Sequence, residues 1–194
     1  GQMIEIGRIT RRGPGFSFSY PVYERLRDQN GVFSGLIALE RQTIEGRVGD
    51  GSSAPAGRFV SGNFFETLGL TPLAGRLLSP RDDRLDAPRD SAVAVLSHRF
   101  WQREFGGSFS AIGQTVRVDA ISFTIVGILP ASFDDVIVGR PADFFVPLAS
   151  ESLVHHDSQL RIAASSWLGI AGRLKPGMSM EGAHANLEPI LSAL

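Results

Sequence analysis

The sequence predicts an α+β fold, and three observations support this class. Segments with alternating apolar and polar residues, which are typical of strands, occur in hairpin-like pairs. Segments with helical periodicity stand between groups of strands rather than after every strand. No motif repeats at a fixed period. This mixed order with hairpins favours an α+β architecture over a doubly wound parallel sheet.

Four helices are predicted from the residues at their ends. Each follows a serine that can cap its N-terminus. The predicted ranges, with the caps, are 19–31, 61–68, 97–105 and 179–194. Asn30-Gly31 is expected to end the first helix in a left-handed turn, and Gly69 and Gly106 are expected to end the next two. Pro189 is expected to interrupt the last helix.

Strands are predicted in the segments that remain. Their ranges are 33–48, 56–60, 92–96, 114–129, 144–148 and 166–174. Alternation over 44–48 indicates a strand with one face in water, and a hairpin-like turn is predicted at 50–53. The segment 114–129 is predicted to be a hairpin by itself, and Pro147 is expected to mark a sheet edge. Residues 1–18 are expected to form a strand fragment and then a loop around Arg11-Arg12-Gly13-Pro14-Gly15.

The composition is that of a globular protein and excludes several functions. A chain of 194 residues can form one large domain or two small lobes. With 19 basic and 20 acidic residues, the net charge of −1 provides no long-range attraction for nucleic acid or an anionic membrane surface. The absence of Cys excludes disulfides, thiolate zinc sites, iron–sulfur clusters and cysteine nucleophiles. It does not fix the cellular compartment.

No segment of the sequence is expected to span a membrane. The longest uncharged stretch, Ala120 to Phe133, is shorter than the roughly 20 apolar residues that a spanning helix needs, and its pattern is that of a strand. Gly1-Gln2-Met3 does not begin a signal peptide, and the sequence ends at Leu194 within a helical pattern. We therefore expect the chain to be part of a longer protein, whose membrane segments would lie elsewhere.

Two charged clusters contain metal-ligand residue types, but their patterns are more typical of solvated loops. His155-His156-Asp157 offers ligand types, but adjacent side chains diverge and rarely bind one ion together. Asp82-Asp83 could bind a divalent cation, but Arg81 and Arg84 flank it and are expected to pair with it. The dense charged segment 79–90 is expected to be a loop and a boundary between lobes. The sequence therefore predicts no metal ligands.

Catalytic and nucleotide-binding motifs are also missing. No Gly-rich phosphate loop connects a strand to a helix. Ser97 adjoins His98, but Ser97 is expected to serve as a helix cap, and no Gly-x-Ser-x-Gly elbow is present. A hydrolase with these two residues stays a minor alternative. The sequence predicts no catalytic residues and no cofactor.

Two aromatic groups could form a binding patch or part of the core. They are Phe64-Phe65 and the helix face with Phe100, Trp101 and Phe105. Bulky aromatic faces on helices usually pack inside a domain. We therefore expect both groups in the core.

Several segments, in a fixed order over residues 19 to 190, carry a family resemblance. They are Ser19-Tyr20-Pro21-Val22-Tyr23 through Gly35, Val60-Ser61-Gly62-Asn63-Phe64-Phe65 through Leu70, Pro72-Leu73-Ala74-Gly75-Arg76, Val93 through Ser97, Phe100 through Gly107, Ile112 through Val116, Phe123 through Pro130, Phe145-Val146-Pro147-Leu148 and Gly172-Arg173-Leu174-Lys175-Pro176-Gly177. In order and spacing the chain resembles the extracytoplasmic core domain of ABC transporter permeases of the MacB/FtsX type. The shared residues are caps, turn glycines and strand centres, which preserve architecture rather than a reactive site.

The resemblance implies a two-lobed α+β domain. A porter-like α/β lobe would comprise residues 1–85 and 160–194, and a smaller inserted β-rich lobe would comprise residues 86–159. The two ends of the chain would lie near each other and face the membrane. The resemblance places the parent protein in the cell membrane and this domain in the periplasm or outside the cell.

The resemblance also implies a function and partners. The domain would belong to a permease that couples cytoplasmic ATP hydrolysis to export or extrusion of a substrate by conformational change, and it would not itself be an enzyme. Its partners would be an ATPase subunit or domain, a second permease copy and a periplasmic adaptor protein. The alternative is a free-standing extracellular peptide-binding or sensor module.

Overall fold

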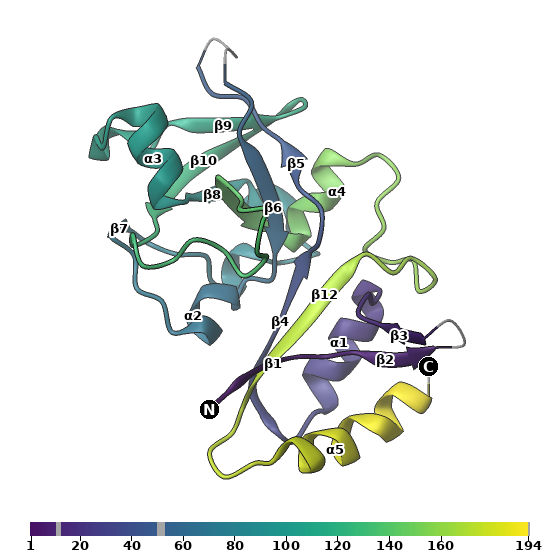
Figure 1. The fold of residues 1–194 in the computed structure, drawn as a ribbon. Helices are drawn as coiled ribbons and strands as arrows, with labels where there is room; N and C mark the ends of the chain where they lie inside the picture. The colour runs from purple at the N-terminus through teal and green to yellow at the C-terminus, as the bar shows by residue number, and fades with distance from the viewer. Residues whose placement is uncertain (11–12, 50–52, 194) are drawn as a thin grey trace.

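One mixed sheet runs through the computed structural model, which describes residues 1–10, 13–49 and 53–193 (Figure 1). The order of its main path is β1 (Met3–Glu5), β12 (Leu168–Leu174), β4 (Phe33–Glu40), β6 (Ala56–Val60), β11 (Phe144–Pro147), β8 (Val93–Leu96), β10 (Ile121–Ile128) and β7 (Ala74–Gly75). Strand β5 (Ile44–Glu45) pairs with β6, and β9 (Thr115–Val118) pairs with β10. The pairs β6–β11 and β8–β10 are parallel, and the others are antiparallel.

In the part of the chain that the structure describes, five α-helices pack around this sheet. They are α1 (Tyr20–Gln29), α2 (Phe64–Leu68), α3 (His98–Phe105), α4 (Glu151–Val154) and α5 (Met180–Ser192). A separate two-stranded ribbon, β2 (Arg8–Thr10) with β3 (Gly13–Gly15), lies beside the end of α5 in Figure 1. Mixed strand pairing with interspersed helices confirms the predicted α+β class. None of these helices is both long enough and apolar enough to cross a bilayer within the described residues.

The core occupies both faces of the sheet. In β4, Leu36 and Ala38 point into one buried cluster while Ile37 and Leu39 point into the other. This alternation is the period-2 geometry of a strand that is covered on both sides. The strand thus separates two apolar layers.

An aromatic group fills one of these layers. Phe145 of β11 packs edge-to-face on Phe65 at a ring-centroid distance of 5.5 Å, and it stacks on Phe64 at 6.3 Å. Phe133 from a loop adds a third contact to Phe145 at 6.1 Å. Phe64 and Phe65 are fully buried, which confirms the predicted core role of this pair.

The junction between β4 and β6 is narrow. Only Leu39 and Val60 are in register there, whereas β12 and β4 are in register from Leu168 and Glu40 to Leu174 and Phe33. Figure 1 shows α1 and α5 on the β4–β12 side of this junction and α3, β9 and β10 on the other side. Two parts of the sheet are therefore joined through few backbone contacts.

Several helix ends follow the signals in the local sequence, but the end of α1 differs from the prediction. Ser97 and Ser179 accept capping hydrogen bonds from Phe100 N and Gly182 N, and Gly69 is left-handed as predicted. Asn30 is extended, with φ −70° and ψ 143°, so the predicted left-handed turn is wrong. Its side chain instead donates to Arg27 O and accepts from Phe33 N, which caps the helix without a left-handed residue.

Two of the predicted serine caps make no capping hydrogen bond: Ser19 is at the predicted N-cap position, and Ser61 is not. Ser19 precedes α1 but its hydroxyl makes no capping bond, and it is buried without a partner. Ser61 lies two residues before the cap of α2, which is Asn63. The Ser61 hydroxyl accepts from Ala38 N and donates to the side-chain oxygen of Asn63, so it ties β4 to the start of the helix.

The two prolines do not act as expected. Helix α5 continues through Pro189, because this residue and Ala185, whose carbonyl loses its partner, both lie on the exposed face. Strand β11 lies between β6 and β8 rather than at an edge. The pairing with β8 ends at Phe145, so Pro147 lies where the strand is paired on one side only. The expected loop at 13–15 is strand β3, and the predicted turn at 50–53 falls largely outside the described residues.

Replacing Phe145 by Ala should lower the free energy of unfolding by about 3–5 kcal/mol, because the variant leaves a cavity between three aromatic rings. Urea denaturation of the 194-residue chain measures the change. Leu73→Ala is the matched control, since Leu73 is 45% exposed, and it should cost well under 1 kcal/mol. Equal losses for the two variants would contradict the assignment of Phe145 to the centre of this layer.

Candidate functional site

The first and last segments of the chain lie side by side. Strand β1 pairs with β12, and Leu174 N donates to Gln2 O at 2.9 Å. Helix α5 packs on α1, where Gly31 N donates to the Asn186 side-chain oxygen at 3.1 Å and Arg25 donates to Ala193 O at 3.2 Å. These contacts hold the first and last elements in one part of the molecule, as predicted, although Figure 1 shows residue 1 and the end of α5 on opposite sides of that part.

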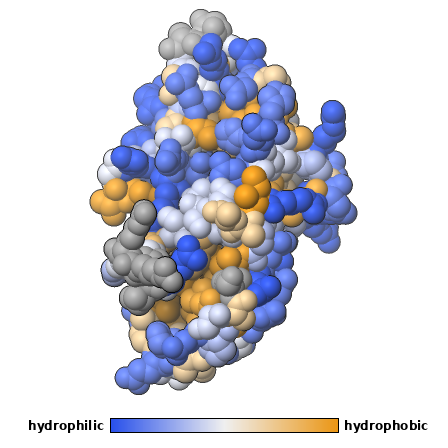
Figure 2. All heavy atoms as spheres, turned by 90° about the vertical axis from the view of Figure 1, so that its right-hand side faces the viewer, coloured by the Kyte–Doolittle hydropathy of each residue, from blue (hydrophilic) through white to orange (hydrophobic). Residues whose placement is uncertain are grey.

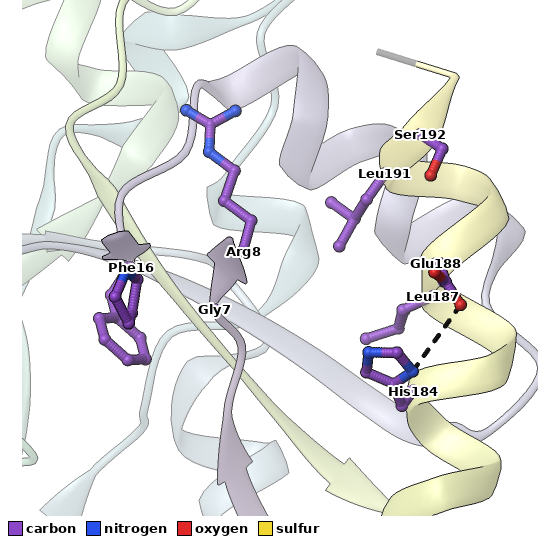
Figure 3. A pocket seen from close by; sticks show the side chains of 9 residues that line it. Gly7, Arg8, Phe16, His184, Leu187, Glu188, Leu191 and Ser192 are labelled. Carbon is purple, nitrogen blue, oxygen red and sulfur yellow. Dashed lines mark ion pairs between the residues drawn. The ribbon is translucent and has the colours of Figure 1, made fainter. Parts of the chain in front are cut away.

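A groove of about 850 Å³ opens next to this meeting point, between the β2–β3 ribbon and α5. We refer to it as the ribbon–α5 groove. Its apolar lining comes from Pro14 and Phe16 on the ribbon side and from Leu187 and Leu191 on the helix side. Figure 2 shows apolar side chains gathered in a hollow in the lower half of this face. In Figure 3 the labelled residues of the two walls face each other across the opening.

The charged groups of the groove differ between its walls. On α5, His184 lies 3.9 Å from the Glu188 carboxylate, and both side chains are mostly exposed. On the ribbon side, Arg8 stands over the ring of Phe18 at 5.5 Å, and its only side-chain hydrogen bond among the described residues is a long one, 3.5 Å, to Ser166 Oγ. Arg8 Nε is buried and has no hydrogen-bond partner.

A buried ion pair lies beside the narrow β4–β6 junction. The Arg58 side chain of β6 is fully buried and lies 3.2 Å from Asp135, whose side chain is 2% exposed. Arg58 also donates to the carbonyl oxygens of Glu40, Gln42 and Arg140 at 2.8, 3.4 and 2.7 Å. One guanidinium thus connects the end of β4, strand β6 and the loop before β11.

Asp135 organises that loop through its carboxylate. Oδ1 accepts from Val136 N, and Oδ2 accepts from Ala142 N at 2.8 Å. Its φ of 145° lies in a region that L-residues rarely adopt. The hydrogen bonds and the ion pair to Arg58 hold this strained backbone in place.

Glu40 is a second acid at the same junction. Burial raises its pKa from 4.5 to about 7, although nearby Arg58 acts to lower it and Glu151 adds to the rise. Its Oε2 is buried and has no hydrogen-bond partner. Glu151 of α4 is buried too and accepts hydrogen bonds from Ser158 and from Gln159 N.

Asp82 and Asp83 have structural partners that differ from the predicted ones. Asp82 pairs with Arg76 through two contacts of 2.8 Å, not with Arg81 or Arg84. Asp83 accepts from Gly62 N at 2.8 Å and from Ala149 N at 2.7 Å, and burial raises its pKa. These two acids therefore join chain segments rather than forming a solvated loop.

The residues weighed for catalysis and metal binding lie apart. Ser97 is 4% exposed and serves as the cap of α3, which removes the geometry that the hydrolase alternative needs. His98 packs its ring on Trp101 at 5.4 Å, while His155 and His156 are exposed at the end of α4. No group of three acidic or imidazole ligands converges among the described residues.

The aromatic face of α3 belongs to the core, as predicted. Phe100 and Trp101 are buried, and Phe105 is partly buried against the same cluster. Trp101 also donates to Ser108 O at 2.8 Å and stacks on the exposed Phe109.

Sequence reasoning missed Arg58, Asp135, Glu40 and Arg8. One signal was available for Arg58, because it is the only charged residue in the segment 56–60. A charge inside a strand that is covered on both faces requires a buried partner. Nothing near Arg58 in the sequence identifies that partner as Asp135.

Several solved structures have a fold similar to that of this chain. Among solved structures, the periplasmic region of MacB from Actinobacillus actinomycetemcomitans superimposes with a TM-score of 0.73 at 16% identity, covering 98% of this chain and 82% of that one. A domain of a putative permease from Porphyromonas gingivalis gives 0.70 at 18% identity, covering 98% and 83%. The extracellular domain of the noncanonic ABC-type transporter YknZ from Gram-positive bacteria gives 0.68 at 13% identity, covering 99% and 94%.

A curated sequence also matches part of the chain. The probable syringafactin export ATP-binding/permease protein SyfD of Pseudomonas syringae pv. tomato is 24% identical over 133 residues. The match covers 68% of this chain and 18% of that protein. This chain therefore corresponds to a small part of such a relative.

The fold is thus that of the extracytoplasmic domains found in bacterial transporter permeases. A family model, the MacB-like periplasmic core domain, matches residues 1–190. The chain belongs to the family of MacB-like periplasmic core domains, which confirms the resemblance seen in the sequence.

Glu40 should make the stability of the domain depend on pH. The folded chain binds this proton more tightly than the unfolded chain, so unfolding releases a proton between about pH 4.5 and 7. The contribution of Glu40 to stability therefore falls as pH rises through that window, by about 1–2 kcal/mol once solvent screening is allowed for.

Gln at position 40 cannot bind this proton. The free energy of unfolding of Glu40→Gln should therefore decline less than that of the wild type between pH 5 and pH 8. Urea denaturation at a series of pH values measures it. Glu45→Gln, at an exposed position of β5, is the control and should keep the wild-type pH profile. A Glu40→Gln profile parallel to that of the wild type would rule out this role.

Proposed function

We propose that this chain is the periplasmic or extracellular part of an ABC transporter permease that uses cytoplasmic ATP hydrolysis to export or extrude a substrate. The match of the family model over residues 1–190 is the observation that carries the proposal. The name of the curated relative, an export ATP-binding/permease protein, agrees with it. On this proposal the ATPase is a separate domain or subunit, and this domain does not itself catalyse a reaction.

The domain would transmit a conformational change rather than bind ATP. It would work with a second permease copy and an adaptor protein, and its two ends would face the membrane. Pairing of β1 with β12 and packing of α1 on α5 support this arrangement, because they keep the ends of the described chain on one part of the molecule. The parent protein would then be anchored in the cell membrane through segments outside this sequence.

We propose that the domain has two lobes, residues 1–85 with 160–194 and residues 86–159, and that they move together as one body. The single registered pair at the β4–β6 junction supports a division of the sheet, but this junction lies within residues 1–85, and the pairs β6–β11 and β7–β10 cross the boundary at residue 85. Around this junction, Arg58 donates hydrogen bonds to Asp135 and to the carbonyl oxygens of Glu40, Gln42 and Arg140. Bending there would break these buried hydrogen bonds, which supports motion of the whole domain as one body.

The rival function is a free-standing extracellular peptide-binding or sensor module. The full-length gene product distinguishes the two. The permease proposal predicts apolar segments of about 20 residues on both sides of this domain. It also predicts that the purified 194-residue chain hydrolyses no ATP above background, while the complete transporter does. A parent protein with only a signal peptide, or ATP turnover by the domain alone, would contradict the proposal.

A cysteine pair tests whether α1 and α5 stay packed together during export. A Cβ added at Gly31, just after α1, would lie 3.6 Å from Asn186 Nδ2 on α5, so an oxidant should link Gly31→Cys to Asn186→Cys after a small local adjustment. In the full-length transporter, reconstituted with its ATPase, oxidation of this pair should leave export within about twofold of the reduced form. Each single variant is the matched control. Export that stops on oxidation and returns on reduction would show that the two helices must separate.

A further inference from the structure

We propose that the ribbon–α5 groove binds an amphipathic anion, namely a single acyl chain that carries an anionic head group. The apolar walls would hold the chain, and Arg8 would bind the head. This inference concerns the domain by itself and does not depend on export. The ribbon–α5 groove has a volume of about 850 Å³, which lies within the range of about 300–1,000 Å³ that is usual for small-molecule sites.

The lining of the groove suits a hydrocarbon chain. Phe16 is 44% exposed although it is one of the larger side chains of the domain, and Leu191 is only partly buried. Pro14 and Leu187 continue the same apolar surface. Contact of this much apolar surface with water is unfavourable, so an apolar ligand gains free energy by covering it.

The charge of Arg8 identifies the head group. No carboxylate lies within 4.0 Å of Arg8 among the residues that the structure describes. Arg8 Nε is removed from water and has no hydrogen-bond partner. A ligand anion in the groove would supply the missing negative charge to the guanidinium, while the buried Nε stays out of its reach.

The other charged groups do not oppose this assignment. Glu188 lies on the α5 wall with its side chain 67% exposed, so water screens its charge, and His184, 3.9 Å away, forms an ion pair with it only when the imidazole is protonated. Arg8 belongs to the ribbon side, so a ligand with its head at Arg8 keeps its chain between the two walls (Figure 3). A cationic head at the same place would meet an unpaired positive charge.

The shape of the groove favours binding of one acyl chain over contact with a membrane surface. The site is a groove between two walls, which holds one ligand, and a bilayer presents a broad surface instead. The net charge of −1 gives the domain no overall attraction to an anionic bilayer. We therefore assign the groove to a monomeric ligand.

Calorimetric titration with dodecanoate, below the concentration at which it forms micelles, tests the proposal on the 194-residue chain. Dodecanoate should bind saturably at one site, and decanoate should bind about tenfold more weakly because two fewer CH₂ groups are buried. Dodecyltrimethylammonium, with the same chain and a positive head, should bind at least tenfold more weakly than dodecanoate. Amide chemical-shift changes should be concentrated at Gly7, Leu187 and Leu191.

Two variants with matched controls locate the head and the chain. Arg8→Gln should weaken dodecanoate binding about tenfold or more, since it removes a charge-assisted contact. Arg84→Gln makes the same charge change at a side chain that is 54% exposed, outside the groove, and should leave binding unchanged. Leu191→Ser should weaken binding, while Leu73→Ser should not.

Three results would overturn the proposal. They are equal affinity for the anionic and cationic amphiphiles, unchanged affinity in a folded Arg8→Gln variant, and binding to vesicles that contain phosphatidylglycerol without binding to monomeric dodecanoate. If Arg8→Gln lowers the melting temperature enough to unfold the chain, the head-charge and chain-length comparisons on the unaltered protein decide the matter.

Discussion

The pairing of β12 with β4 is the constraint on which the rest of the structure depends. Residues 168–174 bind along residues 33–40, and β1 then pairs with the free side of β12. This pairing closes a loop of more than a hundred residues, and such a closure costs chain entropy that only an extended, well-packed contact can offset. Apolar side chains of β4 on both faces supply that packing. The two ends of the chain come together as a direct consequence.

The residues between β4 and β12 in the sequence are held to this closed end by fewer contacts. Their sheet joins β4 through one registered pair of residues, and Arg58 adds hydrogen bonds to two carbonyl groups at the end of β4. A buried ion pair rarely contributes more stability than apolar side chains of equal volume. An apolar side chain at position 58 could fill the space but could not bind three carbonyl groups and Asp135. Arg58 therefore fixes how the two parts of the sheet are oriented.

Structural features that depend on residues close together in the sequence, such as helix caps, could be predicted from the sequence. The hydroxyls of Ser97 and Ser179 bond to amides three residues away, so these caps were visible in the sequence, as was the left-handed Gly69. Contacts over long separations were not visible. Arg58 and Asp135 are 77 residues apart, and Asp83 bonds to an amide 66 residues away, so no spacing rule reveals either contact. The order of strands in the sheet has the same origin, because it is set by packing between distant segments.

The groove next to the chain ends is a product of the same closure. Its ribbon wall is attached to β12 through the bridge between Phe18 and Leu168, with Trp167 N and Leu168 N both donating to Phe18 O. Its helix wall, α5, follows β12 after a short turn and is held by α1. Both walls are therefore positioned by one strand before any ligand arrives. A site whose walls are already ordered loses little conformational entropy on binding, so its affinity depends on how well a ligand matches the apolar lining and the charge of Arg8.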